Sequence, residues 1–171
     1  MDSFDLDGLT VGLHGFEWAA HSDDHAAWLL KQERIIHSPD LINPDQPPFW
    51  KFAGNERFRF HEDSLRQVYG LEWDHLSGSH GNIGTRADID FELAFVADLK
   101  AAIGKAVAEN PFSKFVDPGA GAHTGFLPKF FGTIAQQATA ALRAQVRTPL
   151  WLRGGHPPNA EMVAWAMFEY R

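Results

Sequence analysis

Two aspartates separated by one residue, Asp88 and Asp90, are the side chains of this sequence best placed to do chemistry. They end the segment GSHGNIGTRADIDF, residues 78–91, in which a glycine-rich loop leads into an apolar run. Apolar and polar residues alternate after the loop, which predicts a strand over residues 89–96. Carboxylates at positions i and i+2 of a strand point the same way, roughly 6–7 Å apart. That geometry suits hard oxygen ligands for one or two Mg²⁺ ions.

The Gly78-Ser79 turn upstream adds a second element of this predicted site. Glycine lets backbone N–H groups approach a phosphate without a Cβ in the way. Magnesium held nearby would neutralise the charge that develops during in-line phosphoryl transfer. The alternative is a tight turn before an amphipathic strand whose carboxylates face water.

The order of Gly78-Ser79, a short loop and Asp-Ile-Asp-Phe at residues 88–91 resembles the signature of polymerase-β-type nucleotidyltransferases. The resemblance is local to residues 78–117. It implies magnesium-dependent transfer of a nucleotide from a nucleoside triphosphate to a hydroxyl acceptor.

By this resemblance Gly78 and Ser79 would bind phosphate, and Asp88 and Asp90 would hold magnesium. A third carboxylate, Asp117, would complete the site and help to activate the attacking hydroxyl. The loop between Ser79 and Asp88 is slightly shorter than in that family, and Ser77 stands where an apolar residue is expected.

Two further groups of residues were weighed as sites. His14-Gly15 after a short strand is similar to the opening of ADP-ribosyltransferase-fold, NAD-binding domains, which would need Glu161 or Glu169 as the catalytic glutamate. Glu17, His21 and His25 recur at a spacing of four residues, with further donors nearby at Asp24 and His37. Histidines at this spacing on a helix can bind zinc, although exposed helix-face histidines are the simpler interpretation.

The composition restricts the class of protein. There are 22 acidic and 15 basic side chains, which argues against nonspecific nucleic-acid binding because that needs a basic surface. The sequence has no cysteine, which excludes disulfides and thiolate metal sites and fits a cytoplasmic protein. No apolar run approaches the ~20 residues of a membrane span, so we expect no membrane partner.

The 14 Phe and 6 Trp favour a different function class, a non-enzymatic assembly or interaction protein. Such a protein could be a virion component of a phage head-to-tail or tail structure, or an immunity-type binder. It would act through protein partners or as a homo-oligomer, and a virion component would be virion-associated.

The periodicity predicts one α+β or α/β domain over residues 1–171, with a small mixed sheet against three or four helices. A proline-rich loop at residues 38–48 is the main internal boundary. The expected elements are strands at 9–13, 71–77 and 89–96, a hairpin at 49–61, a short strand near 151, and helices at 17–36, 62–69, 97–109, 130–146 and 159–171.

Overall fold

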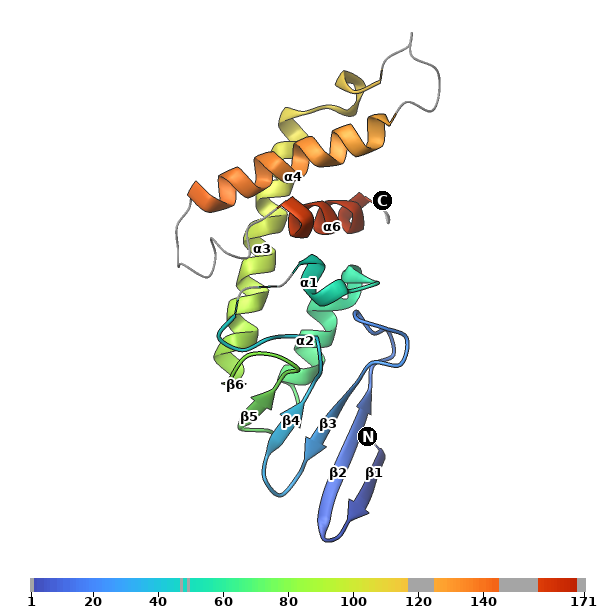
Figure 1. Cartoon of the computed structure of the whole chain (residues 1–171), viewed down its shortest axis with the longest axis vertical. Helices are drawn as coiled ribbons and strands as arrows, with labels where there is room; N and C mark the ends of the chain where they lie inside the picture. The colour runs from blue at the N-terminus through green and yellow to red at the C-terminus, as the bar shows by residue number, and fades with distance from the viewer. Residues whose placement is uncertain (1, 47, 49, 117–124, 145–156, 169–171) are drawn as a thin grey trace. The chain divides into compact units, whose positions relative to one another are not determined.

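The computed structural model describes residues 2–46, 48, 50–116, 125–144 and 157–168 (Figure 1). Its elements form an α+β fold, which confirms the first of the two predicted classes, and the predicted mixed sheet has six strands. The elements are β1 (Asp2–Leu6), β2 (Leu9–Gly15), β3 (Ala26–Leu30), β4 (Ile35–His37), α1 (Lys51–Gly54), η1 (Phe58–Phe60), α2 (His61–Tyr69), β5 (His75–Ser77), β6 (Ile83–Gly84), α3 (Arg86–Glu109), η2 (Phe112–Lys114), α4 (Phe126–Ala144) and α6 (Pro157–Phe168).

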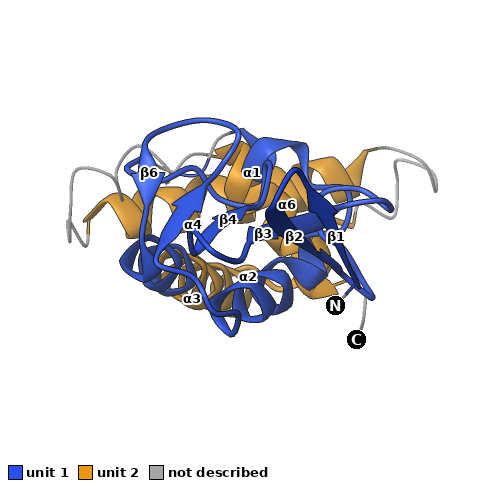
Figure 2. Ribbon diagram, turned by 90° about the horizontal axis from the view of Figure 1, so that it is seen from below, with its two compact units in different colours: residues 1–94 blue, residues 95–171 orange. Residues whose placement is uncertain are grey.

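The chain divides into two compact units, residues 1–94 and 95–171, coloured separately in Figure 2. Unit 1 holds the sheet and α2, and unit 2 holds α4, α6 and the later part of α3. None of the helices in the described ranges combines the length and apolar character needed to cross a bilayer.

The sheet runs in the order β1-β2-β3-β4-β5-β6, so every strand pairs with its neighbour along the chain. All pairs are antiparallel except β4 and β5, which are parallel and are joined through α2. The carboxyl ends of β4 and β5 therefore lie at the same edge of the sheet. Because β3 is antiparallel to β4, the loop that enters β3 meets that edge as well.

One face of the sheet carries the core of unit 1. Alternate strand residues such as Leu29, Ile36 and Leu76 pack with Leu65 and Val68 of α2. Trp73 is fully buried in the same core and donates its indole N–H to the Val68 carbonyl at 2.7 Å. These contacts fix α2 on the sheet and orient the loops at its edge.

Unit 2 is held by aromatic packing between α4 and α6. Phe131 stacks on Trp165 with ring centroids 3.8 Å apart, and Phe130 meets Phe168 edge to face at 5.6 Å. The side chain of Asn110, after α3, donates to Gln137 of α4 at 2.6 Å. The expected helices at 130–146 and 159–171 are thus confirmed as α4 and α6, although α6 begins two residues earlier, at Pro157.

The expected helix over residues 17–36 is wrong, since this segment forms β3, β4 and their connecting loops. Its apolar residues fit a helical period, but Trp28 and Leu29 pair across strands with His37 and Ile36. A local turn, in which the His25 N–H donates to the Ser22 carbonyl, precedes β3. The expected hairpin over 49–61 is also wrong, because that segment forms α1 and η1. The strand expected near residue 151 lies outside the described residues.

The expected strand over residues 89–96 is wrong too, because these residues lie inside the 24-residue helix α3. The helix begins at a T-x-x-D capping-box sequence, Thr85 to Asp88, in which Asp88 makes its half of the box. The Asp88 carboxylate accepts the Thr85 backbone N–H at 2.8 Å, and the Asp88 N–H donates to the Thr85 carbonyl at 3.2 Å. Thr-Arg-Ala-Asp is the sequence signature of such a helix start, and it outweighs the alternation that follows.

Candidate functional site

The structure does not bring the predicted metal ligands together on a strand. Asp88 and Asp90 are two positions apart on a helix, so their side chains do not share a face. Asp88 also has a structural role, since its carboxylate accepts hydrogen bonds from the backbone N–H groups of Thr85 and Asp45. Asp90 is exposed, and Asp117 lies outside the described residues.

Close packing against the loop after β4 explains why glycine occupies positions 78 and 81. A Cβ on Gly78 would lie 2.3 Å from the Ile42 carbonyl oxygen, and one on Gly81 would lie 2.4 Å from that of Pro44. Gly81 also has a φ of +88°, which favours glycine. The space that was expected to receive a phosphate beside Gly78 and Ser79 is thus approached by the protein's own backbone.

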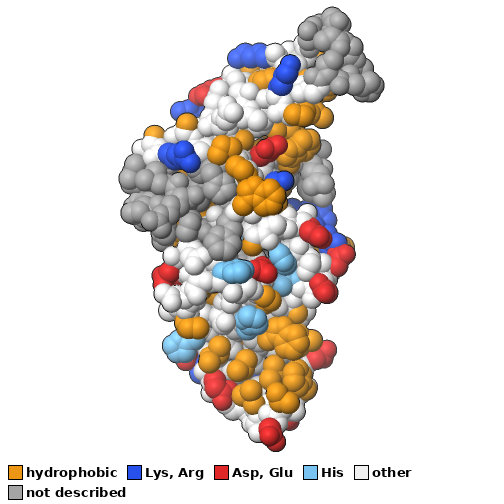
Figure 3. Space-filling view, in the orientation of Figure 1, with side chains coloured by type: hydrophobic (Ala, Val, Ile, Leu, Met, Phe, Trp, Pro, Cys, Tyr) orange, Lys and Arg blue, Asp and Glu red, His pale blue; other side chains and the backbone are white. Residues whose placement is uncertain are grey.

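Three loops meet at the carboxyl edge of β4 and β5, and they bring four ionisable side chains together. The loop at 16–25 supplies His21 and His25, the loop after β4 supplies Asp40, and the loop after β5 supplies His80. We call these four residues the histidine–aspartate cluster. Figure 3 shows several histidine side chains gathered on one face, with an acidic side chain among them.

Asp40 is the centre of the histidine–aspartate cluster. Its Oδ2 lies 3.7 Å from Nε2 of His21, and its Oδ1 lies 3.5 Å from Nε2 of His80. The side chains of His21 and Asp40 are 28% and 29% exposed, and that of His80 is 56% exposed. One carboxylate therefore faces two imidazoles at a place that solvent can reach.

His25 is the buried member of the cluster. Its ring lies 5.1 Å from that of Phe16 and 5.7 Å from that of His21, and neither of its ring nitrogens has a well-aligned hydrogen-bond partner in the described structure. Burial lowers the pKa of His25, although the Pro39 carbonyl acts in the opposite direction. His25 is therefore held in its neutral form beside the two histidines that share Asp40.

A second buried group lies next to this edge. The Asn55 amide donates to Nδ1 of His61 at 2.9 Å, which leaves Nε2 of His61 to donate to Glu92 at 3.2 Å. The side chains of His61 and Glu92 are 1% and 6% exposed. This chain of hydrogen bonds ties the start of α2 to α3, and its burial makes it a structural group.

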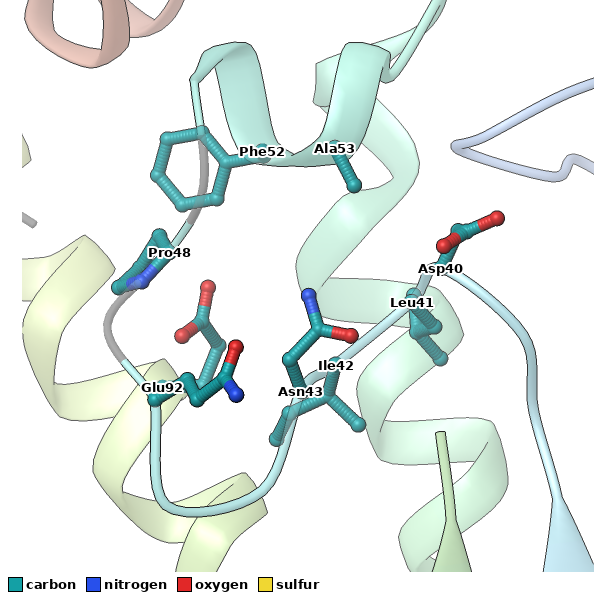
Figure 4. A pocket seen from close by; sticks show the side chains of 9 residues that line it. Asp40, Leu41, Ile42, Asn43, Pro48, Phe52, Ala53 and Glu92 are labelled. Carbon is teal, nitrogen blue, oxygen red and sulfur yellow. The ribbon is translucent and has the colours of Figure 1, made fainter. Parts of the chain in front are cut away.

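The cavity beside Glu92 is too small for a substrate. Its volume is about 10 Å³, which is room for one water at most. Figure 4 shows the Asn43 amide and the Glu92 carboxylate turned toward this cavity beneath Phe52, while Asp40 points away from it. The chemistry of Asp40 is thus directed toward the histidines.

A larger cavity of about 480 Å³ lies within unit 2. Among the described residues, the side chains that line it are large and apolar and include no acidic or basic group. The lining residues are Phe112, Leu127, Phe130, Phe131, Trp165 and Phe168.

The comparisons with known proteins agree on a fold. No family model matches the sequence, and no curated protein matches it. A metallo-β-lactamase family protein from Thermus thermophilus aligns with 97% of this chain and 47% of its own, at 14% identity and a TM-score of 0.53. A stereoselective inverting sec-alkylsulfatase from a Pseudomonas species aligns with 99% of this chain and 26% of its own, at 14% identity and a TM-score of 0.51.

These two likenesses place the chain in the metallo-β-lactamase type of fold. The chain spans less than half the length of either structure, and at such low identity the likeness shows the fold alone.

The resemblance to nucleotidyltransferases is therefore wrong, and with it the predicted nucleotidyl transfer. The fold is of another type, and the aspartates that carried the resemblance lie on a helix. The fold likewise gives no support to the alternatives of a virion component, an immunity-type binder or an ADP-ribosyltransferase.

The name of the metallo-β-lactamase family protein implies a metal ion, which raises the question whether the donor groups of this chain suit a metal centre. A catalytic zinc site uses three protein ligands about 2 Å from the ion. Among the described residues, no three His, Asp or Glu side chains converge closely enough to hold a metal ion. His21 and His80 approach different oxygens of Asp40, at 3.7 and 3.5 Å. The cluster as folded does not fit a metal centre.

Sequence reasoning found only part of this cluster. His21 and His25 have a helical spacing in the sequence, but they lie on a loop, and that spacing includes neither Asp40 nor His80. The sequence feature that could predict the cluster is a polar loop after each of two short segments, residues 35–37 and 75–77. If those segments are parallel neighbours, their following loops must meet at one edge of the sheet.

Proposed function

We propose that unit 1 carries a metal-independent acid–base site that hydrolyses a small ester-like or amide-like bond. The observation that carries this proposal is the sharing of one carboxylate, Asp40, by His21 and His80 at a solvent-accessible edge of the sheet. The fold supports it in a general way, since the similar structures are named as a metallo-β-lactamase family protein and an alkylsulfatase.

The expected chemistry follows from how a carboxylate acts on an imidazole. Asp40 would hold the Nε2–H of His80 and stabilise the imidazolium that forms when the other nitrogen takes a proton. His80, as the most exposed member, would accept a proton from water and return it to the leaving group. His21 would face the second oxygen of Asp40 and fix the carboxylate between the two rings.

His25 would limit the charge of this site. A third imidazolium beside His21 and His80 would compete for the single carboxylate and disfavour proton uptake by either. Burial lowers the pKa of His25 and favours its neutral form, so His25 does not compete with His21 for the Asp40 carboxylate.

The test is hydrolysis of p-nitrophenyl acetate, p-nitrophenyl sulfate and a chromogenic β-lactam by chelator-treated protein between pH 5 and 9. We expect a rate that rises with pH as a histidine loses its proton. His80→Gln and Asp40→Asn should each lower the rate by roughly 10²–10⁴-fold, the usual contribution of a positioned acid–base group.

His75→Gln is the matched control, because His75 is an exposed histidine at the start of β5. It should leave the rate unchanged. The proposal is overturned if the wild type is no faster than buffer, if His75→Gln matches His80→Gln, or if added zinc is required for activity.

A further inference from the structure

The cross-strand register defines a second face of the sheet, opposite the face that packs on α2. Residues directly paired across strands share a face, so the pairs Phe4↔Val11, Leu13↔Trp28 and Val11↔Leu30 lie together. The core residue Leu29 pairs with Gly12 and lies on the other side. We call this opposite side the outer face; its apolar members on the first four strands are Phe4, Leu6, Leu9, Val11, Leu13, Trp28, Leu30 and Ile35.

The outer face is apolar and open to solvent. Phe4, Leu6 and Trp28 are 47%, 62% and 39% exposed, although each lies among other apolar side chains. Phe4 and Trp28 meet edge to face with ring centroids 6.4 Å apart, which joins β1 to β3 across the face. Figure 3 shows apolar side chains grouped over the strands at the lower end of unit 1. A contiguous apolar patch of this kind on a soluble protein marks an interaction surface.

The charge on the outer face indicates which partner fits it. Across the paired positions of β1, β2 and β3 on this face, Asp2 at the margin is the one charged residue. The chain as a whole has a formal net charge of −7. Two copies would therefore repel over most of their surfaces, whereas on the paired positions of β1, β2 and β3 like charge is confined to Asp2 at the margin of the outer face.

We propose that the outer face binds the outer face of a second copy of this chain. Each copy would cover the other's Phe4, Leu6 and Trp28, so that the two sheets pack face to face about 10 Å apart. Such a contact is isologous, because the same patch serves both copies and the assembly closes as a dimer. The proposal is independent of the acid–base site.

The size of the patch sets the expected strength. From the exposed fractions, the apolar side chains offer on the order of 500 Å² per copy, given 150–250 Å² for a whole aromatic side chain. A pair would then bury on the order of 1,000 Å², at the lower limit for specific interfaces. We expect a dimer that dissociates in the micromolar range.

The test is sedimentation equilibrium of the full chain from 5 to 500 µM. The wild type should change from monomer to dimer over this range, and its Tm should rise with concentration. Trp28→Glu should weaken association by about 30-fold or more, as loss of a central aromatic contact does. Leu6→Glu, on the exposed edge strand, gives the same test should Trp28→Glu fail to fold.

Trp50→Glu is the matched control, since Trp50 is 61% exposed and lies before α1, outside the sheet. It should sediment like the wild type. The proposal is overturned by a monomer mass at every concentration, by a dimer that both outer-face variants leave intact, or by equal weakening in Trp50→Glu.

Discussion

The loop at 78–84 lies close to the loop that follows β4. Replacing glycines with alanine can separate the cost of a steric clash between these loops from the cost of backbone strain. Gly81 has a φ of +88°, and a Cβ there would lie 2.4 Å from the Pro44 carbonyl oxygen. Gly8 has a φ of +92° and nothing within 4 Å of its Cβ position. Gly78 has no such strain, but its Cβ would lie 2.3 Å from the Ile42 carbonyl oxygen. A Cβ would therefore meet both backbone strain and a steric clash at Gly81. It would meet only strain at Gly8 and only a clash at Gly78.

The expected losses differ accordingly when each glycine is replaced by alanine. Gly8→Ala should lower the free energy of unfolding by about 1 kcal/mol, the cost of a left-handed backbone for a residue with a Cβ. Gly81→Ala adds overpacking of about 1–3 kcal/mol, because the Pro44 carbonyl must retreat by more than half an ångström. That carbonyl also accepts the Asn82 N–H at 3.3 Å, a bond the shift would weaken.

Urea denaturation of the three variants measures these losses, with thermal unfolding as a second readout. An extra 1–3 kcal/mol in Gly81→Ala would lower its Tm below that of Gly8→Ala by roughly 2–4 °C per kcal/mol. Gly78→Ala should also lose more than Gly8→Ala. If Gly78→Ala and Gly81→Ala lose no more than Gly8→Ala, the two loops are not packed as described, and the geometry around Asp40 fails with them.

Two further predictions concern side-chain pairs of unit 1. The Arg34 guanidinium donates to both oxygens of Asp74 and holds the pKa of that carboxyl below its usual range. The pair therefore stabilises the folded protein above about pH 4, and this stabilisation is lost as the pH falls through the lowered pKa. Arg34→Gln should therefore be less stable than the wild type at pH 7 but equal to it at acid pH, as measured by thermal unfolding across pH; a difference that persists at low pH would contradict the assignment. His61→Phe removes the partner of the buried Glu92 and should cost about 3 kcal/mol in urea denaturation. A loss below about 1 kcal/mol would show that Glu92 finds another partner.

The helices of unit 2 could be predicted from the sequence, because their evidence is local. A 3.6-residue apolar period predicts a buried face over 97–109, 130–146 and 159–171, and helices do lie there. The short helix at 62–69 was found in the same way and is confirmed as α2. Each of these segments forms its backbone hydrogen bonds within itself, so no distant residue is needed to decide its structure.

The segments 17–36 and 89–96 could not be decided from periodicity alone. Both have apolar spacing that a helix or a strand can use, and what decides between them lies elsewhere. The first becomes β3 and β4 because β2 and β5 provide partners on either side, whereas the second is committed to a helix by the Thr85 and Asp88 capping box.

The sequence by itself determined that the chain is acidic, rich in aromatic residues and without cysteine, and it restricted the fold to α+β or α/β. Only the tertiary structure decided where its ionisable groups meet. His21, Asp40 and His80 lie on three separate loops, and they come together because β4 and β5 are parallel neighbours whose ends share one edge. Strand pairing of this kind depends on hydrogen bonds between distant segments, which a local pattern does not contain.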